Sequence, residues 1–224
     1  MITFLRTATF VLVALCQSSF LQANEFVNLS LSGSEVLYPL PSGYCDVTED
    51  FDGIMLKEFL DAQTMPGIPK AQAIVKLCDR GNEDTGYPWA WIGVLKNEPR
   101  VSQKNFNKMM ASFLKNDDML EKLNNKVLES NRELVEDFLG VETTNSTSKQ
   151  RILWADDKSM LLGQKFTSNL GGDIIEEVIL TSASVVNNLY VYTYIYNLKD
   201  ALPSTAELSE LLIDNASKLN DLNF

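Results

Sequence analysis

The sequence predicts an α+β protein in which an antiparallel sheet built from hairpins is covered by helices, the last of them a C-terminal amphipathic helix. Short segments of alternating apolar and polar residues occur in pairs around tight-turn residues, a pattern typical of antiparallel strands. Longer segments with apolar residues every three or four positions predict helices whose apolar face packs on a sheet. No internal repeat or linker divides the chain, so we expect one domain spanning 24–224.

The first predicted elements are a β-hairpin and a short helix. Apolar residues occupy alternate positions in 28–38 on both sides of Ser32-Gly33-Ser34, which predicts a hairpin around a glycine turn. Asp50 or Asp52 can cap a helix over 53–62. The apolar side of that helix is expected to consist of Ile54, Leu56, Phe59 and Leu60.

Two strands and a pair of helices are expected next. The short apolar segments 71–78 and 89–96 flank an acidic, glycine-containing loop and predict strands. Residues 103–115 and 118–139 carry apolar side chains at helical spacing, and Gly140 is expected to end the second helix. A coiled coil is the alternative interpretation of this helix pair.

The last third of the chain is predicted to begin with a polar loop, 143–149, followed by two hairpins. The segments 150–155 and 160–166 flank a polar turn. The segments 174–186 and 189–197 flank an Asn-Asn dipeptide, which tolerates the positive φ angles of a tight hairpin turn.

A capping box over Ser204–Glu207 opens the last predicted helix, because a serine followed three residues later by a glutamate satisfies two free N–H groups. The apolar face of this helix is expected to consist of Leu208, Leu211, Leu212, Leu219 and Leu222.

The first 23 residues have the composition of a secretory signal peptide. Arg6 is their only charge, 8–16 is a short apolar run, and Ala23 precedes a polar segment. The run is too short for a bilayer, which needs about 20 residues, and no later segment qualifies, so no membrane span is expected. We expect cleavage near Ala23 and a periplasmic or secreted protein. The alternative is bacterial lipoprotein processing at Cys16, although the preceding Leu15 is bulkier than the residue usual there.

The mature chain is strongly acidic. Cleavage removes Arg6 from the 19 basic residues and none of the 30 acidic ones, so the formal net charge becomes −12. That charge repels phosphate backbones and anionic lipid surfaces, and we therefore expect no nucleic-acid partner.

Cys45 and Cys78 are the cysteines that remain after cleavage. An even number in an oxidising compartment favours a disulfide, which stabilises a loop of this length by about 3–4 kcal/mol in the chain-entropy account. A catalytic thiol or two buried free thiols are the alternatives.

The chain contains no histidine. Ser-His-Asp and Cys-His catalysis need an imidazole that exchanges a proton near neutral pH, and many zinc sites need its nitrogen as ligand. These classes of site are excluded.

Other motifs resemble catalytic or metal sites without their companion residues. Segment 48–58 resembles a calcium loop, but its first and twelfth positions hold Thr and Phe in place of acidic ligands. Ser112 with Lys115, and Ser146 with Lys149, match the Ser-x-x-Lys spacing of some acyl-enzymes. No pair of carboxylates stands out for glycoside hydrolysis. We assign no catalytic residue, no metal ligand and no cofactor.

Aromatic residues give the best candidate binding surface. Tyr190, Tyr192, Tyr194 and Tyr196 alternate with smaller residues, so all four share one face of a strand. They could form a platform for a small ligand or a partner protein. The favoured interpretation of the four tyrosines is a sheet face beneath a helix with the hydroxyls at its rim, and the platform is the alternative. Segment 87–91 could likewise stack on sugar rings, although core packing of its tryptophans is the favoured interpretation.

Several features together resemble a loose group of uncharacterised proteobacterial exported proteins. These are the sequence Leu40-Pro-Ser-Gly-Tyr-Cys45, a second cysteine at the end of the next strand, the helix pair, and the closing hairpin with its helix. The order of elements also resembles the α/β sandwich of the PsbP-like extrinsic proteins of photosystem II. The resemblance implies a periplasmic location and no established activity, and it transfers no functional residue.

These observations favour a non-enzymatic exported protein that binds another protein or a small ligand. A hydrolase of envelope polymers that uses carboxylates or a Ser-Lys dyad is one alternative. A secreted effector, or the immunity protein against one, is another.

Overall fold

The computed structural model of the chain describes residues 25–62, 69–78, 87–97, 100–116, 143–147, 150–170 and 172–223. The expected signal peptide, the lipoprotein alternative at Cys16, the loop between the two middle strands, and the second helix of the predicted pair lie outside the described residues.

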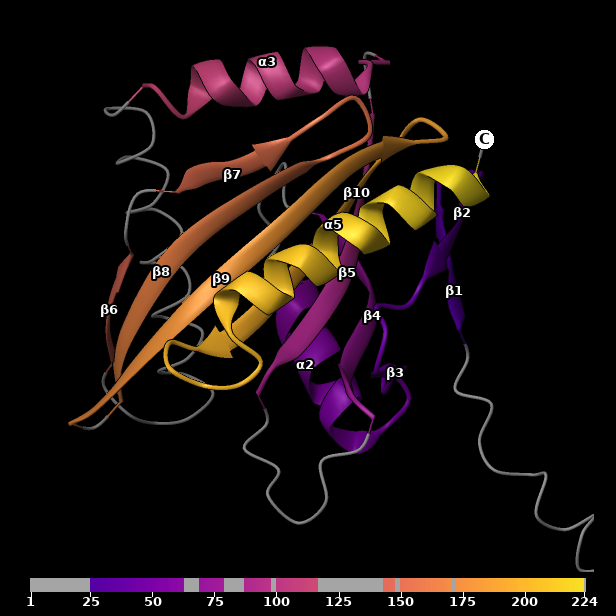
Figure 1. Ribbon diagram of the computed structural model, residues 1–224. Coiled ribbons are helices and arrows are strands. Elements are labelled where there is room, and N and C mark those ends of the chain that lie inside the picture. Colours follow the sequence, from indigo (N-terminus) through magenta and orange to yellow (C-terminus); the bar gives the residue numbers. More distant parts are fainter. Residues whose placement is uncertain are drawn as a thin grey trace, which may run out of the picture.

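The fold is α+β, as the sequence predicts, and its centre is an antiparallel sheet (Figure 1). The strand order is β3 (Tyr44–Asp46), β4 (Lys70–Leu77), β5 (Trp89–Lys96), β10 (Leu189–Leu198), β9 (Asp173–Val186), β8 (Met160–Leu170) and β6 (Thr143–Thr147), with β7 (Arg151–Ala155) also paired to β8. Successive side chains on a strand point to opposite faces of the sheet. Different elements cover these two faces.

Helix α5 (Thr205–Leu222) crosses one face of the sheet, next to a separate two-stranded hairpin of β1 (Phe26–Leu31) and β2 (Ser34–Pro39) (Figure 1). The predicted capping box is present, with both hydrogen bonds made between Ser204 and Glu207. Most of the predicted apolar face of α5 packs inward, but Leu222 lies in the last turn and is 44% exposed.

A buried hydrogen-bond network joins the hairpin, the sheet and α5. The Tyr38 hydroxyl donates to Oδ1 of Asn215 at 2.6 Å and lies 2.6 Å from the Thr193 hydroxyl. Since a tyrosine has one hydroxyl proton, the Thr193 hydroxyl is the donor in the second bond. Asn215 Nδ2 donates to the Pro39 carbonyl at 2.6 Å, so the network also fixes the end of β2.

The opposite face of the sheet is met by α2 (Phe51–Ala62) and α3 (Gln103–Phe113). Leu56 and Leu60 of α2 pack with Ile74 of β4, as predicted. The prediction for Ile54 is wrong, because the close approach of α2 to the chain before it turns Ile54 to solvent. At Gly53 an added Cβ would lie 1.7 Å from the Val47 carbonyl oxygen, so only glycine fits this approach.

The Gln103 side chain attaches α3 to the sheet. Its amide accepts from Val185 N–H at 2.7 Å and donates to the carbonyl of Ala183, the last residue of β9 that is paired to β8. The amide therefore satisfies strand groups that would otherwise be buried without partners. Ser102 is the N-cap of the helix and accepts from Asn105 N–H.

Both predicted tight turns are confirmed. Ser32 and Gly33 have φ of 53° and 81° between β1 and β2, and Asn187 and Asn188 have φ of 47° and 64° between β9 and β10. Two positive φ angles in succession give a turn whose twist matches that of the paired strands.

Two strands at the rim of the sheet were missed or misassigned from sequence. The predicted loop over 143–149 is wrong for 143–147, which pair with β8 as the edge strand β6. Polar, β-branched threonines suit an edge strand as well as a loop, so polarity alone misleads there. The short strand β3 has too few residues to show an alternating pattern.

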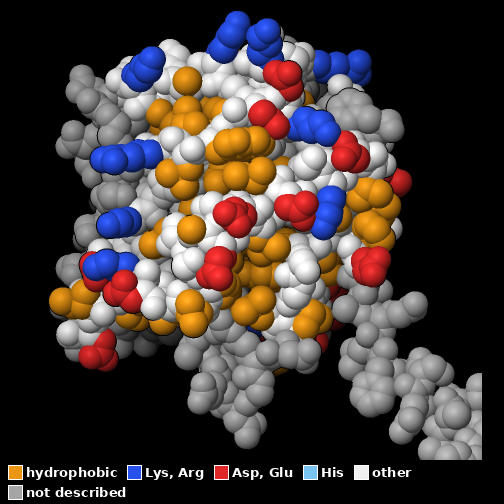
Figure 2. Space-filling view, viewed as in Figure 1, with side chains coloured by type: hydrophobic (Ala, Val, Ile, Leu, Met, Phe, Trp, Pro, Cys, Tyr) orange, Lys and Arg blue, Asp and Glu red, His pale blue; other side chains and the backbone are white. Residues whose placement is uncertain are grey.

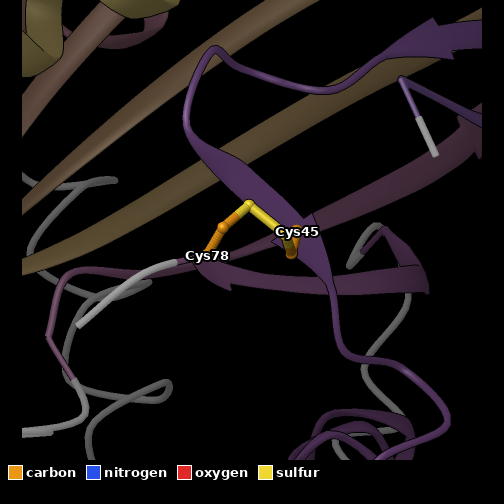
Figure 3. Close-up of a disulfide and its surroundings, with 2 residues drawn as sticks. All are labelled: Cys45 and Cys78. Carbon is orange, nitrogen blue, oxygen red and sulfur yellow. A yellow bond between two sulfur atoms is a disulfide. The ribbon is translucent and has the colours of Figure 1, made fainter. Parts of the chain in front are cut away.

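The predicted disulfide is confirmed. Cys45 of β3 bonds to Cys78, the residue after β4, with Cα atoms 5.0 Å apart (Figure 3). The bond ties the short strand β3 to its only neighbour in the described sheet, β4. It closes over the segment that contains α2, so it also limits how far this helix can move from the sheet.

Candidate functional site

The rings of β10 and β5 form a continuous aromatic surface on the sheet face opposite α5. We call this surface the aromatic face, and it consists of Tyr190, Tyr192, Tyr194, Tyr196, Trp89 and Trp91. The register of β5 against β10 places Trp91 beside Tyr194 and Trp89 beside Tyr196. Both pairs stack, with ring centroids 4.2 Å and 4.3 Å apart and nearly parallel planes. The two predicted aromatic segments therefore meet in one surface.

The surface continues along β10 toward its turn with β9. Tyr192 lies between Tyr194 and Tyr190, at ring-centroid distances of 6.0 Å and 6.4 Å. Tyr190 contacts Phe106 of α3 at 5.1 Å. Aromatic pairs at these distances favour one another beyond their buried area, so the rings support a fixed arrangement.

The residues of the aromatic face fall into two groups that differ in burial. Trp91 is buried, and it packs with Ile74 against Leu56 and Leu60 of α2. The four tyrosines and Trp89 are half-buried, so their ring edges reach the surface. The face is thus partly core and partly exposed surface, and its role in binding stays a prediction.

The lack of a side chain at Gly93 leaves room for the Trp91 indole to lie over the sheet. An added Cβ at Gly93 would lie 2.5 Å from a ring carbon of Trp91 and 2.9 Å from the Pro69 side chain. Gly93 is also the residue directly opposite Tyr192. Because Gly93 has no side chain, the indole can lie over the backbone beside Tyr192 and extend the flat aromatic surface.

The tyrosine hydroxyls of the aromatic face are held in their neutral form. Burial raises the pKa of Tyr194 well above its ordinary value, and the neighbouring Tyr192 and Tyr196 add to the rise. Burial also raises the pKa of Tyr196 to about 12, although a hydrogen bond from Trp91 opposes it. The hydroxyls therefore remain uncharged donors and acceptors at neutral pH.

A buried carboxylate lies at the Tyr196 end of the aromatic face. Glu177 of β9 is 9% exposed, and its position in the register places it on the same side of the sheet as the tyrosines. The Tyr87 hydroxyl donates to its Oε1 at 2.6 Å. Burial raises the pKa of Glu177, and the Tyr87 hydrogen bond partly offsets this rise.

Sequence reasoning did not single out Glu177. It stands in a strand with Glu176 beside it, and the sequence does not show which of the two points inward. The register of β9 against β10 across the Asn-Asn turn could have identified Glu177. In that register Ile179 lies opposite Tyr196, and Glu177 lies two residues before Ile179 on the same side of the strand.

The described residues do not assemble the catalytic sites considered from the sequence. Ser112 and Lys115 are both exposed, so no desolvated lysine lies beside that serine. Ser146 lies in β6, and Lys149 lies outside the described residues. The next acidic residue on the Glu177 side of β9 is Asp173, roughly 13 Å along the strand, which exceeds the carboxylate spacing of glycosidases.

The segment that resembles a calcium loop is occupied by α2. The helix begins at Phe51, within the twelve-residue span that such a loop would need, and Asp52 pairs with Lys76 at 3.1 Å. Within the described ranges, no group of three or more acidic or cysteine side chains is placed to hold a metal ion.

The side of the molecule that carries α5 has a mixed, charged surface. Figure 2 shows acidic side chains over α5 and basic ones along the rim near α3. Some of these charges form exposed ion pairs, such as Lys218 with Asp214 at 2.8 Å. Exposed pairs of this kind contribute little to stability and are typical of a solvated helix face. The aromatic face lies on the other side of the sheet.

No protein-family model matches this chain, and no curated protein matches it. Among solved structures, the chain is similar to the solution structure of cyanobacterial PsbP (CyanoP) from Synechocystis sp. PCC 6803. The two share 10% sequence identity over 89% of this chain and 93% of that chain, with a TM-score of 0.41.

Proposed function

We propose that this chain is an exported, non-enzymatic protein that binds a small organic ligand on its aromatic face. The observation that carries the proposal is the pair of stacked Trp–Tyr contacts, whose rings form a flat surface with edges that reach solvent. Flat rings with neutral hydroxyls at their edges offer apolar contact area together with hydrogen-bonding groups, the combination typical of ligand sites.

A small ligand is favoured over a protein partner by the helices that border the face. Phe106 of α3 packs on Tyr190 at one end, and Leu56 and Leu60 of α2 pack beside Trp91. A standard protein interface needs about 800 Å² on each partner and a broad accessible surface. A strip of rings bordered by two helices suits a compact molecule better.

Export is supported by two features of different kinds. The first 23 residues have signal-peptide composition, and Cys45 and Cys78 form a disulfide, which persists in oxidising compartments. In the described part of the chain, no helix is long and apolar enough to cross a membrane. We propose a periplasmic or secreted location, with cleavage near Ala23.

Native mass spectrometry tests the proposal and does not require the ligand to be identified first. The protein is purified from its producing cells without denaturation, and its mass is compared before and after unfolding. We expect a chain that starts near Asn24, carries one disulfide, and loses a small-molecule adduct on unfolding. An intact Met1 terminus would contradict export, and the absence of any adduct in folded protein would count against ligand binding.

Matched variants locate the adduct. Tyr192→Ser removes a half-buried ring that belongs to none of the described core clusters, and Tyr192→Phe keeps the ring. Phe51→Ala removes an exposed apolar side chain of α2, 78% exposed, and controls for nonspecific adsorption. The adduct should be lost in the first variant and kept in the other two. Retention in Tyr192→Ser, with folding intact, would exclude the part of the aromatic face around Tyr192 as its site.

A further inference from the structure

Glu177 and its neighbour Glu176 differ in their burial, in the side of β9 on which they lie, and in the charge of the group that each contacts. Glu176 is exposed on the opposite side of β9 and pairs with Lys199 at 2.8 Å. Glu177 is buried on the aromatic side, and among the described residues its bonded partner is the neutral hydroxyl of Tyr87. The chain therefore neutralises the exposed carboxylate and leaves the buried one without a described cation.

A buried carboxylate without a cation is unfavourable for the folded state. Transfer of a charge from water into a protein interior destabilises it unless a partner of opposite charge compensates. One hydrogen bond from Tyr87 compensates in part, and burial still raises the pKa of Glu177 above its ordinary value. A positively charged ligand group would supply the opposite charge that the described residues do not place beside Glu177.

Aromatic rings from β10 and from the chain at the start of β5 lie on the same side of the sheet as Glu177. Tyr87 contacts the carboxylate, and Trp89 stacks on Tyr196 at 4.3 Å. Tyr196 lies close enough that the charge of Glu177 contributes to the rise of its pKa, after burial. All three rings are half-buried, so each keeps part of its surface exposed beside the buried Glu177. Ring faces attract cations, most strongly where water is partly excluded.

We propose that this corner of the aromatic face binds an organic ammonium group, with Glu177 as its counter-ion and Tyr87, Trp89 and Tyr196 around it. The proposal rests on the aromatic face being a ligand site and names the chemical class of that ligand. A metal ion fits poorly, because hard cations such as Ca²⁺ need six to eight oxygen ligands and this corner offers one carboxylate and two tyrosine hydroxyls. The net charge of −12 expected for the mature chain also favours the approach of a cation.

The test is a fluorescence titration of purified protein that carries Trp154→Phe. Trp154 packs in the core on the α5 side, so its removal leaves Trp89 and Trp91 as reporters of the aromatic face. The probe is tetramethylammonium chloride at constant ionic strength, with sodium chloride as the salt control and tert-butanol as a neutral molecule of similar shape. We expect a saturable change with tetramethylammonium, a much weaker one with tert-butanol, and none with sodium chloride.

Two charge-neutralising variants separate the carboxylates. Glu177→Gln keeps the acceptor for Tyr87 and should weaken tetramethylammonium binding by about tenfold or more. Glu176→Gln makes the same change of charge one residue away on the opposite side of the strand and should leave binding unchanged. Equal effects of the two variants would show a general electrostatic attraction and overturn the proposal.

The neutral probe distinguishes failure of this inference from failure of the proposed function, and it needs no variant at Glu177. Equal saturable binding of tert-butanol and tetramethylammonium would overturn the ammonium proposal and leave a small-ligand site on the aromatic face. A response to neither probe would overturn the ammonium proposal, and the adduct experiment would then decide the proposed function independently.

Discussion

Replacement of Tyr38 by Phe removes one oxygen atom from the centre of the molecule and tests how the hairpin is held to the sheet. Tyr38 is 0% exposed, and its hydroxyl is 2.6 Å from both Asn215 Oδ1 and the Thr193 hydroxyl. Phe keeps the ring, so the loss is confined to two buried hydrogen bonds. Buried polar groups left unsatisfied cost about 1–3 kcal/mol, and we expect a loss near 2 kcal/mol.

The assay is urea unfolding of the wild type and the variants, followed by thermal unfolding. The comparison requires that all of them show the same dependence of the free energy of unfolding on urea concentration. A loss near 2 kcal/mol corresponds to a decrease of roughly 4–8 °C in Tm for a protein of this size. Tyr190→Phe is the matched control, because Tyr190 is half-buried and should change stability by less than about 0.5 kcal/mol.

A double-mutant cycle with Thr193→Val measures the network directly. Because the two side chains are bonded to each other, their effects should be non-additive by about 1 kcal/mol. Equal stabilities of Tyr38→Phe and Tyr190→Phe, together with additive effects in the cycle, would refute the network as a determinant of stability.

The remaining predictions concern the disulfide, the pH dependence of stability, and the contact of Gly93 with Trp91. Reduction of the Cys45–Cys78 bond, which spans 33 residues, should lower the free energy of unfolding by about 3–4 kcal/mol; an unchanged urea midpoint under reducing conditions would contradict this. Burial raises the pKa of Tyr38 and of the aromatic-face tyrosines above the value of 10.0 expected when unfolded. Their stabilising contribution is therefore fully present below pH 10 and is lost as the pH rises through 10, so the urea midpoint should decrease from there; a constant midpoint up to pH 11 would show that these hydroxyls are not buried. The raised pKa of Glu177 means that its protonated form favours folding, and this contribution is lost as the pH rises through the folded pKa. Glu177→Gln should therefore be more stable than wild type at pH 7 and nearly equal to it at pH 4, whereas a variant less stable at pH 7 would show an unrecognised cation partner. Gly93→Ala should lower stability by about 1–3 kcal/mol and change Trp91 fluorescence, because the Cβ meets the indole; unchanged unfolding would refute that contact.

Long patterned segments of the chain could be predicted from sequence because each carries two agreeing signals. The hairpin of β9 and β10 combines alternating apolar residues with an Asn-Asn turn, and α5 combines an apolar stripe with a capping box. Local turn chemistry and the burial pattern favour the same conformation in these segments, so tertiary contacts did not change it.

The edge strand β6 could not be predicted, because its assignment depends on the neighbour that it meets. Thr143–Thr147 are polar and lack alternation, and only the long strand β8 beside them makes them a strand. Ile54 was misassigned for a related reason. The prediction of a helix with one apolar side is correct. Because Gly53 lies against Val47, the side of α2 that faces the sheet carries Leu56 and Leu60, and Ile54 lies outside it.

The candidate site was half predictable. The shared side of the four tyrosines follows from strand geometry, whereas their stacking on Trp89 and Trp91 requires the register of β5 against β10. Glu177 requires the register of a further strand, and its significance lies in burial, which a single sequence does not show.

The central claim is that the aromatic face and its buried carboxylate form a ligand site. An NMR titration of the indole N–H signals of the three tryptophans with tetramethylammonium tests it most directly, because Trp154 lies on the other side of the sheet as an internal control. We expect saturable shifts of the Trp89 signal and smaller shifts of the Trp91 signal, with the Trp154 signal unchanged. Uniform shifts of all three signals, or a Trp89 signal that does not move, would contradict it.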